Sequence, residues 1–237
     1  MLRRNTYRLV LYLVMLGLVL WFRARFSESQ NRHTVESRVK QFGEAAARRW
    51  QPYFEKAGVP YPPRQVVLVG LKQEKQLLVY AGTESLRFIR SFPIVKASGT
   101  IGPKLKEGDR QVPEGLYTIE YLNPNSRYHL SMKISYPNAF DQARAAGEGR
   151  TDLGGDIMIH GKDVSIGCLA MGDEAAEDLF VLAAKTGIDK VRVILAPVDF
   201  RTRSLTPAER AGLPPWTDRL YAEIEAALRE LPPAPQS

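Results

Sequence analysis

The sequence contains one cysteine, and its thiol is the side chain best suited to form a covalent intermediate. That residue is Cys168, and the 237-residue chain has only three histidines. A thiolate attacks acyl carbons, and a neighbouring imidazole can take the thiol proton. His160 precedes Cys168, and the loop of residues 161–167 between them can fold back and bring the two side chains together. This spacing predicts Cys168 as a nucleophile and His160 as its base.

The residues around Cys168 fit the other needs of acyl chemistry. A free cysteine has a pKa of about 8.5, and a nearby imidazole or a helix N-terminus lowers that pKa. We expect both here, because a helix is predicted to begin near Asp173. Gly167 leaves the backbone free to turn, so that the N–H groups around Cys168 can converge on a developing oxyanion.

Other polar residues are candidates for contacts rather than for chemistry. Ser165 and His129 are the candidate substrate-binding side chains. Ser165 is more typical of a serine that hydrogen-bonds its own loop than of a catalytic serine. For His129, a structural hydrogen bond and a substrate contact are equally open. Lys104 and Lys106 are interpreted as solvated loop charges, with a contact to a substrate carboxylate as the alternative.

No pattern for a metal or a phosphate-bearing cofactor is visible. Three dispersed histidines and one cysteine lack the spacing of a zinc site. Gly99 and Gly102 lack the Lys-Ser/Thr pair and the helix that follow a phosphate-binding loop. We therefore expect neither a metal nor a cofactor.

The net charge of +7 is concentrated near the N-terminus. Residues 1–65 hold 12 Lys and Arg against 4 Asp and Glu, and the remainder holds 21 against 22. The presumed globular part is therefore near neutral, which argues against a nucleic-acid partner.

The first residues indicate a membrane anchor. Arginines precede an apolar run, Leu9–Phe22, and no small-residue cleavage site follows it. We interpret residues 1–26 as an uncleaved single-pass anchor in the cytoplasmic membrane, with a cleaved signal as the alternative. The arginines predict a cytoplasmic N-terminus and a catalytic part in the periplasm or outside the cell. In such a compartment, a lone cysteine raises the question of a function.

The elements that must position these residues are mostly strands with flanking helices, an α+β class. Short β-branched or aromatic runs predict strands, and apolar residues three or four apart predict helices. The expected strands are 66–71, 76–81, 86–95, 116–121, 128–135, 156–160 and 191–196. The expected helices are 33–57 with a break at Pro52, 173–186 capped by Gly187, one starting at Thr206-Pro207, and 217–231, with a loop at 137–155. The helix at 33–57 is interpreted as a stalk or a packing arm. The predicted segments are an anchor (1–26), a helical stalk or linker (27–63), a catalytic domain (64–200) and a helical tail (201–237).

Two separated motifs resemble those of the L,D-transpeptidase (YkuD-type) catalytic domain family. Ile159-His160-Gly161 followed by Ser165-x-Gly167-Cys168 is similar to that family's histidine-glycine pair, loop and Ser/Thr-His-Gly-Cys signature. Upstream, Gly102-Pro103-Lys104 through Pro113-Glu114-Gly115-Leu116-Tyr117 resembles its Gly-x-x-x-Thr-Pro-x-Gly-x-Tyr stretch. The resemblance covers roughly residues 64–196.

The resemblance implies a β-rich fold with the site in a groove, and peptidoglycan stem peptides as substrate. Cys168 would attack the bond after the third residue, diaminopimelate, and form a thioester that an amine or water resolves. His160 would be the base, oriented by a backbone carbonyl near Gly161. The N–H groups of Gly167 and Cys168 would hold the oxyanion. No obligate protein partner is expected.

The sequence departs from the common pattern beside the cysteine. Ile166 stands where most members have histidine, and Ala170 stands where most have arginine or asparagine; Ser-Ile-Gly-Cys-x-Ala-Met resembles the YafK-like branch. These departures leave the acyl acceptor open. The alternatives are a transpeptidase, or an L,D-carboxypeptidase or amidase that releases groups attached to diaminopimelate. A non-catalytic binding domain of the cell envelope is the alternative of another class.

Overall fold

The computed structural model describes residues 15, 17 and 32–235, and its chain divides into two units, Met1–Thr34 and Val35–Ser237. The predicted anchor, residues 1–26, lies outside the described residues except for Met15 and Gly17. Among the described residues, no helix combines the length and the apolar character that crossing a bilayer requires. The following paragraphs concern the second unit only.

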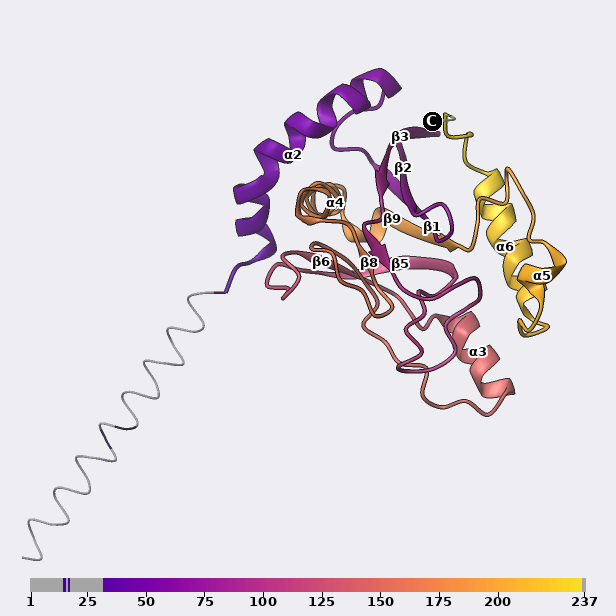
Figure 1. Ribbon diagram of the computed structural model, residues 1–237. Coiled ribbons are helices and arrows are strands. Elements are labelled where there is room, and N and C mark those ends of the chain that lie inside the picture. Colours follow the sequence, from indigo (N-terminus) through magenta and orange to yellow (C-terminus); the bar gives the residue numbers. More distant parts are fainter. Residues whose placement is uncertain (1–14, 16, 18–31, 236–237) are drawn as a thin grey trace, which may run out of the picture. The chain divides into compact units, whose positions relative to one another are not determined.

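Nine strands of the described residues form one mixed sheet (Figure 1). They are β1 (Gln65–Leu71), β2 (Gln76–Gly82), β3 (Leu86–Pro93), β4 (Lys96–Ala97), β5 (Gly115–Asn123), β6 (Ser131–Ile134), β7 (Met158–His160), β8 (Leu169–Ala170) and β9 (Val191–Ala196). Their order in the sheet is β3-β2-β1-β9-β5-β6-β7-β8-β4. The pairs β1–β9 and β7–β8 are parallel, and the other neighbouring pairs are antiparallel.

The central strands are buried on both faces, because each face of the sheet carries its own apolar core. Successive side chains of a strand point to opposite faces. In β1, Val66 and Leu68 accordingly join one core, and Val67 and Val69 join the other. The first core includes residues of α2 (Val35–Ala57) and α4 (Asp173–Thr186), and the second includes residues of α6 (Thr217–Arg229). Figure 1 shows these helices on opposite sides of β1. The predicted β-rich class with flanking helices is confirmed.

Helix α2 is packed into the first core, so of the stalk and the packing arm that the sequence left open, the contacts favour the packing arm. Trp50 and Phe54 are fully buried, and the indole N–H of Trp50 donates to the carbonyl oxygen of Asp178 in α4 at 3.0 Å. Arg49 donates to the buried carboxylate of Asp178 at 2.7 Å. The expected break at Pro52 is wrong, since the helix continues to Ala57. Apolar packing on α4 offsets the hydrogen bond that the proline removes.

A short helix, α3 (Ala139–Gly147), occupies part of the region predicted to be a loop. Its N-terminus is a capping box, in which Asn138 accepts from the N–H of Asp141 and Asp141 accepts from the N–H of Asn138. Helix α4 begins at Asp173 and is capped by Gly187, as predicted. The remaining helical elements are η1 (Ile188–Lys190) and α5 (Pro207–Arg210).

The C-terminal helix α6 is tied to the loop that enters β5. The carboxylate of Glu114 is fully buried and accepts from Lys72 Nζ at 2.9 Å, from the N–H of Gly102 at 2.9 Å and from the Tyr221 hydroxyl of α6 at 2.8 Å. Burial lowers the pKa of Lys72, and the charge of Glu114 opposes that shift. This network fixes the first part of the segment that forms one wall of the site.

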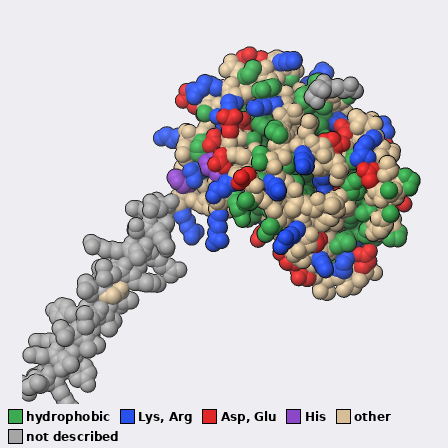
Figure 2. All heavy atoms as spheres, viewed as in Figure 1, with side chains coloured by type: hydrophobic (Ala, Val, Ile, Leu, Met, Phe, Trp, Pro, Cys, Tyr) green, Lys and Arg blue, Asp and Glu red, His purple; other side chains and the backbone are tan. Residues whose placement is uncertain are grey.

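Acidic and basic side chains are interspersed over the folded unit on the face that Figure 2 shows. That face has no single-sign field of the kind that a nucleic-acid surface carries. The distribution agrees with the near-neutral charge count of residues 66–237.

If α2 is an integral part of the fold, removing its central aromatic side chain should destabilise the whole unit. We expect Trp50→Ala to lower the free energy of unfolding by about 3–5 kcal/mol, because a buried indole and its hydrogen bond are lost. Urea unfolding of the full chain measures this. Gln51→Ala, on the exposed side of the same helix, is the control and should change stability by less than about 0.5 kcal/mol. Equal small effects of both changes would show that α2 is only a stalk.

Candidate active site

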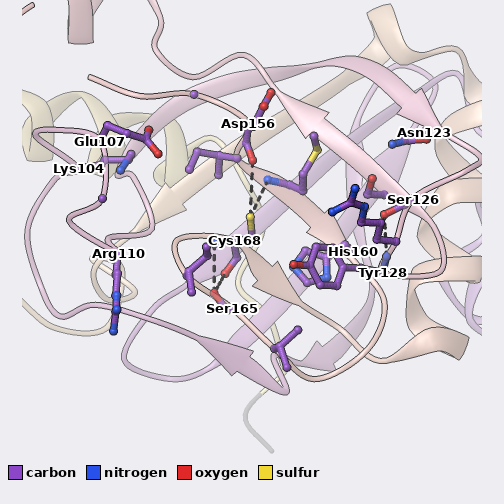
Figure 3. A pocket seen from close by; sticks show the side chains of 18 of the residues that line it. Lys104, Glu107, Arg110, Asn123, Ser126, Tyr128, Asp156, His160, Ser165 and Cys168 are labelled. Carbon is purple, nitrogen blue, oxygen red and sulfur yellow. Dashed lines mark hydrogen bonds between the residues drawn. The ribbon is translucent and has the colours of Figure 1, made fainter. Parts of the chain in front are cut away.

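Cys168 lies at the wall of a cavity of about 780 Å³, between two segments that come from distant parts of the chain (Figure 3). Lys104, Glu107 and Arg110 lie on one side of it in this view, and Ser126 and Tyr128 lie on the other. The thiol sulfur accepts from the N–H of Met158 at 3.4 Å and lies 3.7 Å from the carbonyl oxygen of Asp156. The pairing of β7 with β8 therefore places Cys168 beside the strand that ends at His160.

Burial of Cys168 raises the pKa of its thiol, and the negative charge of Asp156 adds to that effect. The N–H of Met158 and the positive charge of Lys104 oppose the shift without cancelling it. The prediction that a helix N-terminus lowers the pKa of this thiol is wrong. Strand β8 separates Cys168 from Asp173, where α4 begins. At neutral pH the resting thiol is thus protonated.

His160 ends β7, and its side chain is buried while lining the same cavity. Its Nδ1 is 2.6 Å from the carbonyl oxygen of Gly161. A carbonyl oxygen only accepts, so Nδ1 carries the hydrogen and Nε2 keeps the lone pair of the neutral ring. Burial lowers the pKa of His160, and the bond to Gly161 opposes this. The imidazole is therefore neutral at rest and has one basic atom, Nε2.

The predicted oxyanion donors are occupied by Ser165 in this structure. The hydroxyl of Ser165 accepts from the N–H of Cys168 at 3.1 Å and of Gly167 at 3.3 Å, and it donates to the carbonyl oxygen of Cys168 at 2.6 Å. Gly167 has a φ of 125°, a conformation that favours glycine and aims this backbone. Ser165 is thus a loop-bonding serine that also lines the cavity, and the two N–H groups point to one oxygen.

His129 is placed by structural contacts rather than at the cavity. Its Nε2 lies 2.9 Å from a carboxylate oxygen of Glu177 in α4, and its ring packs edge-on against Phe42 of α2. It is absent from the residues that line the cavity. Of the two readings that the sequence left open, these contacts favour the structural one.

Lys104 is buried, where the sequence indicated a solvated loop charge. Its Nζ donates to Asp109 at 2.7 Å and to the carbonyl oxygen of Lys106 at 2.8 Å. Asp109 also accepts from the N–H groups of Leu105, Lys106 and Gln111. These hydrogen bonds hold the loop that contains Lys104 and Asp109, which forms the wall of the cavity opposite His160.

The two departures from the family pattern have different surroundings. Ile166 lines the cavity and is 75% exposed, so a side chain here can meet a ligand. Ala170 is fully buried in β8, and its carbonyl oxygen accepts from the N–H of Val95. The difference at position 170 therefore concerns packing and leaves the cavity surface unchanged.

Three cavity residues were missed by the sequence reasoning. The ring of Tyr128 covers the ring of His160, with centroids 4.7 Å apart. Arg110 and Arg127 line the cavity, and no hydrogen bond or ion pair of their guanidinium groups is found among the described residues. No local pattern marks these residues, because their loops meet only in the folded chain. Among the described residues, no group of three or more His, Cys, Asp or Glu side chains is arranged to hold a metal ion.

The resting state predicts how the thiol reacts with an alkylating agent. Because the pKa of Cys168 is raised, iodoacetamide labelling should be slow at pH 7. Labelling should rise with a midpoint above that of an ordinary exposed cysteine, about 8.5. Labelling rates between pH 6 and 10, followed by intact mass, measure this. A midpoint below pH 7 would show a preformed thiolate instead.

The roles of the two side chains predict distinct losses of turnover. Cys168→Ala should abolish turnover of the substrate proposed below and leave the thermal midpoint nearly unchanged. His160→Gln should lower turnover by about two to four orders of magnitude, the usual contribution of a general base. Steady-state kinetics on the purified full chain test both. Substantial turnover by Cys168→Ala would refute a cysteine mechanism.

Comparisons with known proteins agree with the motifs. The family model for the YkuD L,D-transpeptidase catalytic domain matches residues 64–193, more than half of the chain. The proteins named "Putative L,D-transpeptidase YafK" of Escherichia coli strain K12 and of O157:H7 are each 39% identical over 112 residues. That match covers 46% of this chain and 43% of theirs, so the chain spans less than half of the length of these curated relatives.

Solved structures are more distant. The helical cell shape determining protein Pgp2 from Campylobacter jejuni is 24% identical with a TM-score of 0.46, over 61% of this chain and 54% of that one. L,D-transpeptidase 1 of Mycobacterium tuberculosis is 14% identical with a TM-score of 0.33, over 56% and 62%. These scores are too low to support a conclusion, and the assignment rests on the family model. By that match, the chain belongs to the YkuD L,D-transpeptidase catalytic domain family.

Proposed function

We propose that the protein is a cysteine acyl-transfer enzyme that acts on peptidoglycan stem peptides at diaminopimelate. The observation that carries the proposal is that a thiol and an oriented base line the same cavity. Cys168 and His160 both line it, and the bond to Gly161 leaves Nε2 of His160 as the basic atom. Family membership supplies the substrate class.

The reaction runs from the neutral pair that the structure describes. As Sγ of Cys168 attacks the carbonyl carbon of diaminopimelate, Nε2 of His160 takes the thiol proton. The C–N bond to the next residue then breaks, and the leaving amine takes the proton from the imidazolium. A C–S bond, the thioester, remains. An amine or water next attacks the thioester while His160 accepts its proton, and Cys168 leaves as the thiol.

The oxyanion formed in this reaction needs hydrogen-bond donors. The hydroxyl of Ser165 occupies the expected donors in this structure. We propose that the substrate oxygen displaces the Ser165 hydroxyl from the N–H groups of Gly167 and Cys168. The hydroxyl of Ser98 lies 3.4 Å from that of Ser165 and offers it a replacement partner. Two N–H groups that already converge on one oxygen need little reorganisation to hold another.

Two arginines at the cavity wall suit the free carboxylates of a stem peptide, and the carboxylates of Glu107 and Asp156 line the same cavity. Arg110 and Arg127 present guanidinium groups at its wall, and stem peptides carry free carboxylates. Their position supports a peptide that extends across Cys168. The N-terminal segment supports a matching location, since an anchor at residues 1–26 would hold the catalytic unit at the outer side of the cytoplasmic membrane.

The identity of the acyl acceptor distinguishes two enzyme activities within this proposal. A transpeptidase passes the thioester to an amine, and a carboxypeptidase or amidase passes it to water. Every residue up to the thioester is shared. The exposed Ile166 stands in place of a polar side chain, so the cavity has one polar group fewer to bind an amine acceptor. This difference favours the hydrolytic relative as the second candidate.

Product analysis with stem tetrapeptide tests the proposal directly. We expect the wild-type protein to release the fourth residue and to give tripeptide in water. With an added D-amino acid, we expect an exchanged tetrapeptide if an amine is accepted. Mass spectrometry distinguishes these products, and Cys168→Ala is the control.

The remaining outcome separates the enzyme from a binding domain. Tetrapeptide that binds but stays intact, in a preparation whose Cys168 remains free of oxidation, would contradict the acyl-transfer proposal. It would favour the non-catalytic envelope domain.

A further inference from the structure

Tyr128 covers one face of the His160 imidazole, although it takes no part in the reaction written above. The two ring centroids are 4.7 Å apart and the rings are tilted by 34°. Tyr128 is 39% exposed and lines the cavity, so its ring lies at the cavity wall rather than in the core. Figure 3 shows the two rings side by side, apart from Cys168 and its hydrogen bonds.

The backbone that carries Tyr128 is held on both sides. Its own N–H donates to the hydroxyl of Ser126 at 3.1 Å, and the preceding carbonyl, that of Arg127, accepts from Lys162 Nζ at 2.6 Å. The N–H of Gly161 donates to the carbonyl oxygen of Leu130 at 3.1 Å. The ring therefore stays near His160 without a hydrogen bond between the two side chains.

Gly161 makes this close approach possible. A Cβ at position 161 would lie 2.8 Å from the carbonyl oxygen of Tyr128 and 3.0 Å from Cβ of His129. The segment that carries Tyr128 thus packs directly on the backbone that supplies the carbonyl partner of His160.

A ring in this position acts differently on the two states of His160. The face of a tyrosine ring carries negative charge density and attracts a cation within about 6 Å. The neutral imidazole gains little from it, whereas the imidazolium that exists during proton transfer gains the full attraction. An interaction that is stronger in the transition state than in the ground state raises kcat.

We infer that Tyr128 is a positioning residue for His160, which holds the imidazole edge toward Cys168 and stabilises the imidazolium formed in the reaction. The inference rests on the proposed function for its catalytic effect. Lys162 ties the loop after His160 to the carbonyl of Arg127, the residue before Tyr128, and so helps to hold the two segments together.

A double-mutant cycle on thiol alkylation tests the inference without a peptide substrate. At pH 7 the protonated thiol must pass its proton to His160 as it is alkylated, so the rate depends on how well the imidazolium is stabilised. Tyr128→Ala should slow iodoacetamide labelling of Cys168 at pH 7 by about 3- to 30-fold, the usual range of a cation–π contact. In a His160→Gln background the same change should alter the rate less than twofold. An equal slowing in both backgrounds would overturn the inference.

Kinetic constants on stem tetrapeptide test the catalytic part. Tyr128→Ala should lower kcat by a similar factor and change KM little, and Tyr128→Phe should restore kcat to within about twofold because the ring is kept. Tyr53→Ala is the matched control, a similarly exposed tyrosine on α2 that does not line the cavity. A rise in KM with unchanged kcat, or a phenylalanine variant as slow as the alanine variant, would contradict a positioning role.

The two proposals fail in different ways. If the wild-type protein leaves tetrapeptide intact, the proposed function fails, and the alkylation cycle still decides whether Tyr128 acts through His160. If tetrapeptide is turned over but the cycle shows no coupling, only the role of Tyr128 is lost. Thermal unfolding of each variant checks that the fold is unchanged.

Discussion

The hydrogen bond from Nδ1 of His160 to the carbonyl oxygen of Gly161 is the constraint on which the chemistry of this site depends. It fixes which nitrogen is protonated, and so which nitrogen can accept the thiol proton. Without it the buried imidazole could present either atom to Cys168. The surrounding structure keeps this carbonyl in place, because the N–H of Gly161 donates to the carbonyl oxygen of Leu130, immediately before β6.

Burial of both reacting groups sets a neutral resting state. It raises the pKa of Cys168 and lowers that of His160, so both shifts oppose a standing thiolate–imidazolium pair. In the proposed reaction the ion pair forms as Cys168 attacks, and the N–H of Met158, the charge of Lys104 and the ring of Tyr128 can support it. Loops anchored by buried charges, Lys104 with Asp109 and Lys72 with Glu114, keep the cavity walls fixed around this pair.

Local signals in the sequence predicted those features of the fold that depend on neighbouring residues. The ends of α4 follow from acidic residues at its start and Gly187 at its end, and both were predicted. The helix α3 was missed although Asn138 and Asp141 form a readable capping box, because its few apolar residues indicated a loop. The packing of α2 could not be read locally, since its buried partner Asp178 lies far along the chain.

The residues of the site also divide into those that a local motif indicates and those whose contacts depend on distant segments. Motif spacing indicated Cys168 and His160, which both line one cavity, and the family resemblance implied the carbonyl near Gly161 as the partner of His160. The contacts of His129, the burial of Ala170 and the stacking of Tyr128 depend on segments that meet only in the folded chain, and the sequence did not reveal them. The pKa of Cys168 differs from expectation for that reason, because burial is a tertiary property.

The central claim is a thioester between Cys168 and diaminopimelate. Rapid acid quenching of the full chain with stem tetrapeptide, followed by peptide mapping, tests it most directly, since a thioester survives at low pH. We expect a tripeptide adduct on the peptide that contains Cys168, and we expect hydroxylamine to remove it. Turnover without any adduct there, or an adduct on another residue, would contradict it.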